Sequence, residues 1–199
     1  MTQFDLDLAE LLCARLCHDM AGPVGAAAAG AELLEDSPDP ETAAMVATSA
    51  AGAVARLKFL RTAFGPAGSP QPPEVIRDLA AGYLRSAATG GAGGLRLAWT
   101  CRPAPLDGES ARLVLNLILI ARDGLPRGGE IRVEIDETLR VGLFGPGAGL
   151  SEDVRQALTA GKPPAGPREA QAGLAARLAF KLRGFPQLEA VDGGVFMTV

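Results

Sequence analysis

The first third of the chain is divided by a short segment, Asp36-Ser37-Pro38-Asp39-Pro40, that interrupts any helix. Before it, apolar residues recur every four positions from Leu8 to Met20, and this spacing predicts one helix over about residues 5–35. After it, Asp39 can cap a second helix, which is predicted to run to Phe64. The chain is therefore expected to begin with a helical hairpin.

Both helices of this hairpin are rich in alanine, so they bury little apolar surface by themselves. Pairing two hairpins into a four-helix bundle would give each apolar stripe a partner. We therefore expect a homodimer through residues 5–64. The alternative is that the hairpin packs only on the rest of its own chain.

The remainder of the chain alternates helical and strand patterns, which predicts a sandwich of helices on a sheet. The expected fold class is therefore α plus α/β, with a hairpin at 1–65, a linker at 66–72 and a second domain at 73–199. The predicted helices of that domain lie at 74–88, 109–122, 151–160 and 168–183, and its predicted strands at 95–99, 131–135, 139–143, 188–191 and 195–199.

Composition excludes several classes of protein. With 48% hydrophobic and 21% charged residues, the chain is not disordered as a whole, and a net charge of -4 argues against a nucleic-acid binder. Three cysteines do not make a disulfide framework. The acidic N-terminus does not resemble a signal peptide, and the run 113–121 is too short to span a membrane. A cytoplasmic location with no membrane partner is expected.

His18 is the only histidine in the chain. Its neighbours on a helical surface are all small, so the imidazole would be open to another protein; they are Ala14, Ala21, Gly22 and Gly25. Pro23 lacks an N–H and would leave the Asp19 carbonyl without its helical hydrogen bond. Antiparallel pairing of the hairpin places three basic residues level with His18, where they could neutralise a phosphoryl group or contact an acidic partner; these are Arg56, Lys58 and Arg61. An ordinary solvated helix face is the alternative for them.

The segment from His18 to Val24 resembles the H-box of sensor histidine kinases, which has His, an acidic residue, Pro at +5 and an aliphatic residue at +6. In that family the motif lies on the first helix of a dimeric two-helix hairpin. The second half resembles the ATPase domain of the same kinases, a GHKL or Bergerat-like sandwich, through Leu115–Ala121 and Pro126–Val133.

Two functional positions of that ATPase domain are missing. The asparagine that coordinates Mg²⁺ in the kinases corresponds to Ile120, which offers no oxygen ligand. The aspartate that reads adenine corresponds to Gly145, and Gly173-Leu174-Ala175 resembles a remnant of the last glycine box. These losses argue against ATP hydrolysis. From the residues alone, we expect a plain turn at 145–149, before a helix capped by Ser151.

A kinase-like hairpin joined to a degenerate ATPase domain resembles the ChpT-type histidine phosphotransferases. The resemblance implies that His18 carries a phosphoryl group from the receiver domain of a hybrid histidine kinase to the receiver of a response regulator. Asp19 would orient or deprotonate the imidazole. Mg²⁺ would come from the receiver, and this chain would bind no cofactor or metal. The residues expected to contact the phosphoryl group or the receiver are Arg15, Gly22, Arg56, Lys58 and Arg61.

Other interpretations stay open at this stage. Asp19 could be an ordinary carboxylate on the helix surface, since adjacent helical residues do not face each other. Cys13, Cys17 and His18 could hold a metal, although no fourth ligand is evident. The protein could also be an active histidine kinase with divergent motifs, or a non-catalytic scaffold that binds receivers.

Overall fold

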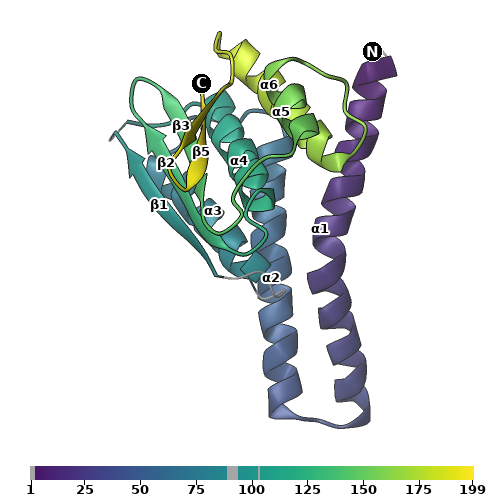
Figure 1. Ribbon diagram of the computed structural model, residues 1–199. Helices are drawn as coiled ribbons and strands as arrows, with labels where there is room; N and C mark the ends of the chain where they lie inside the picture. Colours follow the sequence, from purple (N-terminus) through teal and green to yellow (C-terminus); the bar gives the residue numbers. More distant parts are fainter. Residues whose placement is uncertain (1–2, 89–93, 103) are drawn as a thin grey trace.

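The computed structural model describes residues 3–88, 94–102 and 104–199, and it begins with two long antiparallel helices (Figure 1). These are α1 (Gln3–Asp36) and α2 (Pro40–Phe64), so the predicted hairpin is confirmed. The α2 helix begins as predicted, because the Asp39 carboxylate accepts from the Thr42 backbone N–H at 2.8 Å. The distal half of the hairpin projects beyond the rest of the molecule (Figure 1).

The second half of the chain forms a mixed five-stranded sheet with helices packed on one face. Strand order is β1-β2-β3-β5-β4, in which β1 and β2 are parallel and the other neighbours antiparallel. The helices and strands lie where they were predicted, but the class is more accurately α plus β. The elements are α3 (Pro73–Ala88), β1 (Leu95–Cys101), α4 (Gly108–Asp123), β2 (Gly129–Ile135), β3 (Leu139–Phe144), α5 (Glu152–Thr159), α6 (Pro167–Lys181), β4 (Gln187–Val191) and β5 (Gly194–Thr198).

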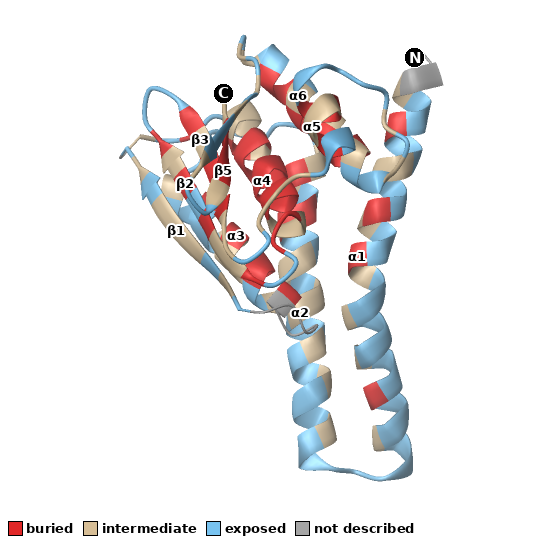
Figure 2. Ribbon diagram, in the orientation of Figure 1, coloured by how far each residue is buried: buried red, intermediate tan, exposed pale blue. Residues whose placement is uncertain are grey.

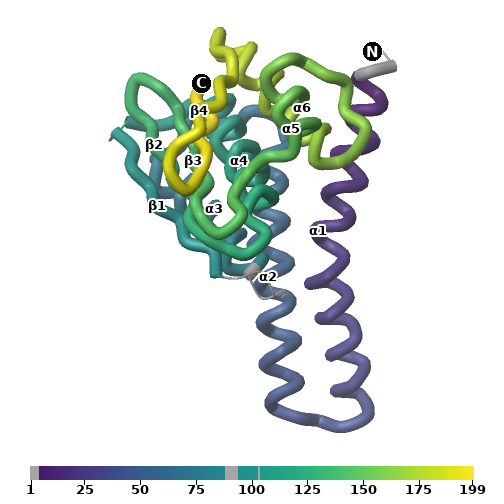
Figure 3. The backbone as a smooth tube through the Cα atoms, in the orientation of Figure 1, coloured from purple at the N-terminus to yellow at the C-terminus, as the bar shows by residue number. Residues whose placement is uncertain are grey.

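The core is built around α4, which lies between the sheet, α2 and α6 (Figure 2). Every residue from Leu113 to Ala121 is buried, so the longest apolar run of the sequence is a core helix. Asn116 is buried within it and donates to the Ala63 carbonyl at 2.9 Å. That bond satisfies a carbonyl in the last turn of α2 and ties the hairpin to the second half. The tube in Figure 3 traces α6 beside the N-terminal half of α1, which it contacts.

One arginine joins three helices at the level of His18. Pro23 lies inside α1, and the helix continues through it. The Asp19 carbonyl that Pro23 leaves free accepts instead from Nη1 of Arg56 on α2, at 2.8 Å. Nη2 of Arg56 donates to the Ser86 carbonyl on α3 at 2.7 Å. The guanidinium therefore fixes α1 against both α2 and α3.

We predict that the contribution of Arg56 depends on Pro23. Arg56→Met should lower the free energy of unfolding by about 2 kcal/mol, since a charged group donates to the partly buried Asp19 carbonyl. In a Pro23→Ala background the loss should be clearly smaller, because an alanine at that position could supply the missing N–H to the carbonyl. Urea unfolding of the two single variants and the double variant measures the coupling.

Arg85→Met, which removes an exposed arginine of α3, serves as the matched control and should change stability by less than about 0.5 kcal/mol. Strict additivity of the Pro23 and Arg56 substitutions would show that Arg56 does not replace the lost helical hydrogen bond.

Candidate functional site

His18 lies on α1 with its imidazole 88% exposed. The helix surface beside it is open: a Cβ atom added at Gly22 or Gly25 would meet nothing within 4 Å. Neither glycine is therefore required by packing within this chain. This agrees with the expectation that another protein can approach the imidazole closely.

Asp19 differs sharply from its neighbour, because its carboxylate is only 8% exposed. The alternative of an ordinary surface carboxylate is therefore wrong. Oδ1 of Asp19 lies 3.4 Å from Nδ1 of His18. Although side chains of adjacent helical residues diverge, the aspartate reaches the near side of the ring while facing the interior.

The carboxylate of Asp19 is surrounded by groups from three helices. Its Oδ2 lies 3.4 Å from the hydroxyl of Tyr83 on α3, 3.8 Å from Nε of Arg15 and 3.9 Å from Nη1 of Arg122 on α4. Burial raises the pKa of the Tyr83 phenol well above its usual value, so the hydroxyl stays protonated. Asp19 is thus surrounded by potential donors.

Arg15 forms a short, buried ion pair between the hairpin and the second half. Its Nη1 lies 2.6 Å from Oδ2 of Asp123, at the end of α4, and its side chain is 6% exposed. Burial acts to lower the pKa of the guanidinium, but the carboxylates of Asp123 and Asp19 outweigh it, so the pKa lies above its usual value. Arg15 was predicted to contact a phosphoryl group or receiver; the structure places it in the interior, paired with carboxylates of its own chain.

The other predicted contact residues are spread over several surfaces. Gly22 lies one turn from His18 and is exposed. Arg56 is level with His18, as predicted, but its guanidinium is directed at backbone carbonyls. Lys58 lines a groove of about 590 Å³ between α2 and α3, and Arg61 is exposed in the last turns of α2. The structure therefore does not gather these residues around the imidazole.

A cavity of about 620 Å³ borders His18 and brings together residues that the sequence did not single out. Besides His18, Arg15 and Asp19, it is lined by Ala14, Arg122, Asp123, Gly166, Pro167, Arg168 and Glu169. The one available signal in the sequence was the charged pair Arg122-Asp123, which directly follows the buried run of α4.

Cys13 and Cys17 are exposed, and the described part of the chain contains no cluster of metal-ligating residues around them.

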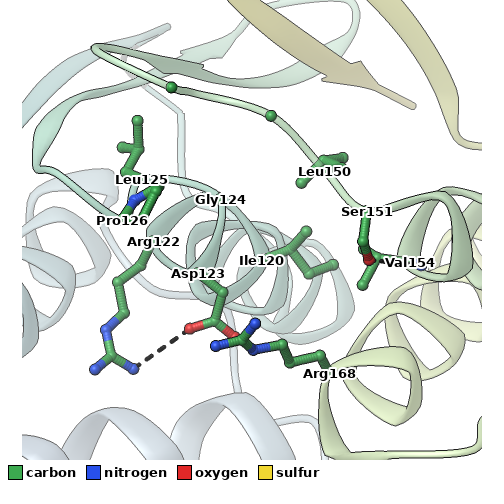
Figure 4. Close-up of a pocket in the computed structure, with 12 residues that line it drawn as sticks. Ile120, Arg122, Asp123, Gly124, Leu125, Pro126, Leu150, Ser151, Val154 and Arg168 are labelled. Atoms are coloured by element: carbon green, nitrogen blue, oxygen red, sulfur yellow. Dashed lines mark hydrogen bonds and ion pairs between the residues drawn. The ribbon is translucent and has the colours of Figure 1, made fainter.

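A second cavity, of about 400 Å³, shares Arg122, Asp123 and Arg168 with the first (Figure 4). It lies where the kinase resemblance places the nucleotide, and Ile120 lines it with an aliphatic side chain. Asp123 is the sole carboxylate among its described lining residues. This carboxylate is already paired with Arg15 and lies 3.6 Å from Arg122.

The backbone at Gly145 also fits poorly with a nucleotide-reading aspartate. Its φ is +157°, and a Cβ atom there would come within 2.7 Å of the Gly128 carbonyl oxygen. Any side chain at this position would require the loop to move. The residues present therefore do not fit a Mg²⁺–nucleotide site of the kinase type.

Comparison with known proteins agrees with this geometry. Residues 75–185 match the family model for the histidine phosphotransferase C-terminal domain. Over 135 residues the chain is 38% identical to protein phosphotransferase ChpT of Brucella abortus (strain 2308), an alignment that covers 66% of this chain and 62% of that protein. The chain thus spans about three fifths of the curated relative it matches.

A solved structure described as a bacterial phosphotransferase at 1.7 Å resolution resembles the whole chain. It has a TM-score of 0.79 and 28% sequence identity, and the comparison covers 100% of this chain and 97% of that one. The family match spans more than half of the chain. By these findings the chain belongs to the histidine phosphotransferase family.

Proposed function

We propose that this protein carries phosphoryl groups in a phosphorelay, using His18 as the acceptor. The donor is the phosphorylated aspartate of a receiver domain in a hybrid histidine kinase, and the final acceptor is the receiver aspartate of a response regulator. The observation that carries this proposal is the exposed imidazole with a buried carboxylate 3.4 Å from its Nδ1.

The chemistry follows from that pair. An acceptor at Nδ1 favours the tautomer with its proton on Nδ1, which leaves the lone pair of Nε2 free in solvent. Nε2 attacks the phosphorus of the acyl phosphate, so that an N–P bond forms as the bond to the donor's carboxylate oxygen breaks. The next receiver aspartate reverses the step and leaves neutral histidine.

The receiver supplies the remaining requirements of the reaction. Phosphoryl transfer depends mainly on in-line positioning and on neutralisation of charge. A receiver brings its own acidic pocket and Mg²⁺, so this chain need provide only His18, its orientation and access to it. The poor fit of the 400 Å³ cavity to a nucleotide supports a carrier that works without ATP.

We predict that His18 becomes labelled when the purified protein is mixed with a ³²P-phosphorylated receiver domain and Mg²⁺. The label should be labile in acid and stable in base, as expected of phosphohistidine, and absent from His18→Gln. Because the chain has a single histidine, this one substitution removes every possible phosphohistidine. Label on His18→Gln, or none on the wild type from any of several receivers, would contradict the proposal and favour a non-catalytic scaffold.

A parallel sample replaces the receiver with ³²P-labelled ATP and Mg²⁺. We expect no label on the protein in this sample, because no described residue stands in for the missing Mg²⁺ ligand and adenine reader. Labelling of His18 from ATP would instead support the alternative of an active histidine kinase.

We also propose that the protein is a homodimer through the hairpin. Exposed apolar residues on α2 are spaced alternately four and three apart, which is the spacing of a bundle seam; they are Ala43, Ala47, Ala50, Val54 and Leu57. A second exposed stripe on α1 comprises Leu6, Cys13, Cys17, Val24, Ala28 and Ala31. At 100° per residue both stripes lie on the same face of the hairpin, opposite Gly22 and Ala26. A second copy would cover both, in a four-helix bundle.

By length and composition α2 could also cross a membrane. This was not expected from the sequence, in which the run at 113–121 is too short to span a membrane. We favour a second copy as the occupant, because the apolar residues of α2 form one stripe and Arg56 and Ser49 lie on the opposite side. We accordingly propose that the protein is cytoplasmic and that it binds receiver domains, not nucleic acid or lipid.

The stripe makes a direct prediction. Ala50→Glu places a charge in the seam and should convert the dimer to a monomer, measured by sedimentation equilibrium. Ala44→Glu, at an exposed alanine that lies outside the stripe, should leave the dimer intact. A wild-type protein that stays monomeric at all concentrations would contradict the proposal, as would a dimer that tolerates Ala50→Glu.

A further inference from the structure

Asp19 follows His18 directly on a helix, and side chains at adjacent positions point about 100° apart. An aspartate there can orient the imidazole only if something holds its carboxylate toward the ring. We propose that Tyr83 and Arg122, from the second half of the chain, are positioning residues that hold Asp19 at Nδ1 of His18. The inference rests on the proposed phosphotransfer at His18 and assigns the second half a part in its chemistry.

The first support is a continuous chain of donors that ends at Asp19. Nη1 of Arg122 donates to the phenol oxygen of Tyr83 at 3.0 Å. Since that oxygen receives a donor from Arg122, the Tyr83 proton is free to point at Oδ2 of Asp19, 3.4 Å away. Oδ1 of the same carboxylate remains for Nδ1 of His18.

The second support is the rigid placement of Tyr83. It is the single tyrosine of the chain, it is buried, and its ring stacks on Phe59 of α2 with centroids 4.2 Å apart. The guanidinium of Arg122 lies 5.7 Å from the ring centroid. The hydroxyl is thus held by packing against α2 and by a charge on α4, and it has little freedom to turn away from Asp19.

The third support is the charge around the carboxylate. Arg15 and Arg122 face its Oδ2, Asp123 balances them, and Arg56 holds the backbone carbonyl of the same residue. Nε of Arg15 is buried, has no hydrogen-bond partner among the described residues and lies 3.8 Å from Oδ2 of Asp19. Arg15 and Arg122 attract Oδ2 of Asp19, Arg56 fixes its backbone, and Oδ1 is left for the imidazole.

Anchoring of Asp19 matters most while the phosphoryl group is being transferred to the imidazole. As Nε2 attacks phosphorus, positive charge develops on the ring, and the 3.4 Å contact at Nδ1 can tighten onto an anchored carboxylate. Without Tyr83 and Arg122, Arg15 would remain as the described side chain of opposite charge near Oδ2 of Asp19, and the carboxylate could turn away from the ring. The ring would then lose its preferred tautomer and its preferred orientation.

Tyr83→Phe tests this most cleanly, because it removes the hydroxyl and keeps the aromatic stack on Phe59. ¹⁵N NMR reports the two imidazole nitrogens without overlap, since the protein has one histidine. We expect the share of the Nδ1–H tautomer to fall and the single-turnover rate of transfer from a phosphorylated receiver to fall about three- to tenfold, the value of one hydrogen bond. Affinity for the unphosphorylated receiver should not change.

Arg122 gives a second, independent variant. Arg122→Gln should shift the tautomer in the same direction, and Arg122→Lys, which keeps a donor and a charge, should recover part of the loss. Arg96→Gln removes an arginine on the outer face of the sheet and serves as the control, with the wild-type tautomer and rate. Thermal unfolding confirms that each variant folds; if Tyr83→Phe does not, the Arg122 series carries the test.

The outcomes separate this inference from the function on which it rests. Wild-type tautomer populations and rates in both Tyr83→Phe and Arg122→Gln would overturn the positioning role while leaving phosphotransfer intact. Failure of the wild type to accept label from any receiver would overturn the proposed function itself. The NMR comparison would then still show whether Tyr83 and Arg122 set the orientation of His18.

Discussion

Burial of a carboxylate beside an exposed imidazole is the constraint on which the rest of this structure depends. An ionised aspartate removed from water costs several kcal/mol unless charged and hydrogen-bonding partners offset the loss. Asp19 obtains such partners from α1, α3 and α4, while Arg56 of α2 holds its carbonyl. The hairpin and the second half must therefore pack closely at this one level of α1. The orientation of the histidine and the arrangement of the two halves are consequences of the same contacts.

The charged residues of the second half contact the helix that carries His18, where those of a nucleotide-binding domain would contact a nucleotide. Among the described residues that line the cavity expected for a nucleotide, the one carboxylate is Asp123, which is paired with Arg15, and this cavity shares Arg122, Asp123 and Arg168 with the cavity beside His18. In this chain, therefore, the charged residues at the end of α4 act on α1. Asp123 pairs with Arg15, and Arg122 reaches the hydroxyl of Tyr83. The part of the chain that resembles an ATPase domain thus contacts α1 close to His18, and we propose that it supports the helix that carries the phosphoryl group.

The sequence was sufficient wherever a local pattern determined the structure. The break at 36–40 and the four-residue spacing from Leu8 to Met20 predicted the hairpin, and His18 and Asp19 followed from a short motif. Contacts between distant residues could not be predicted in this way. Arg15 pairs with Asp123 across 108 positions, and only the three-dimensional structure, which brings the end of α4 within reach of the Arg15 side chain, shows it.

The position of Arg56 could be predicted from a local pattern, but its contacts with distant residues could not. The hairpin register placed it correctly at the level of His18, and Pro23 was known to free the Asp19 carbonyl. The direction of the guanidinium, however, depends on Ser86 of α3, which the register of the hairpin does not specify. Likewise, whether Lys58 and Arg61 face the imidazole depends on the rotation of α2, which is set by the burial of Phe59 and Leu60.

In the proposed function, phosphoryl groups pass through His18 between two receivers. The most direct measurement mixes three purified proteins, a ³²P-labelled donor receiver, this protein and an unlabelled acceptor receiver, and follows the label on each over time. We expect label to appear briefly on this protein and then to accumulate on the acceptor, and we expect His18→Gln to leave the acceptor unlabelled. Labelling of the acceptor at the same rate with His18→Gln as with the wild type would contradict it.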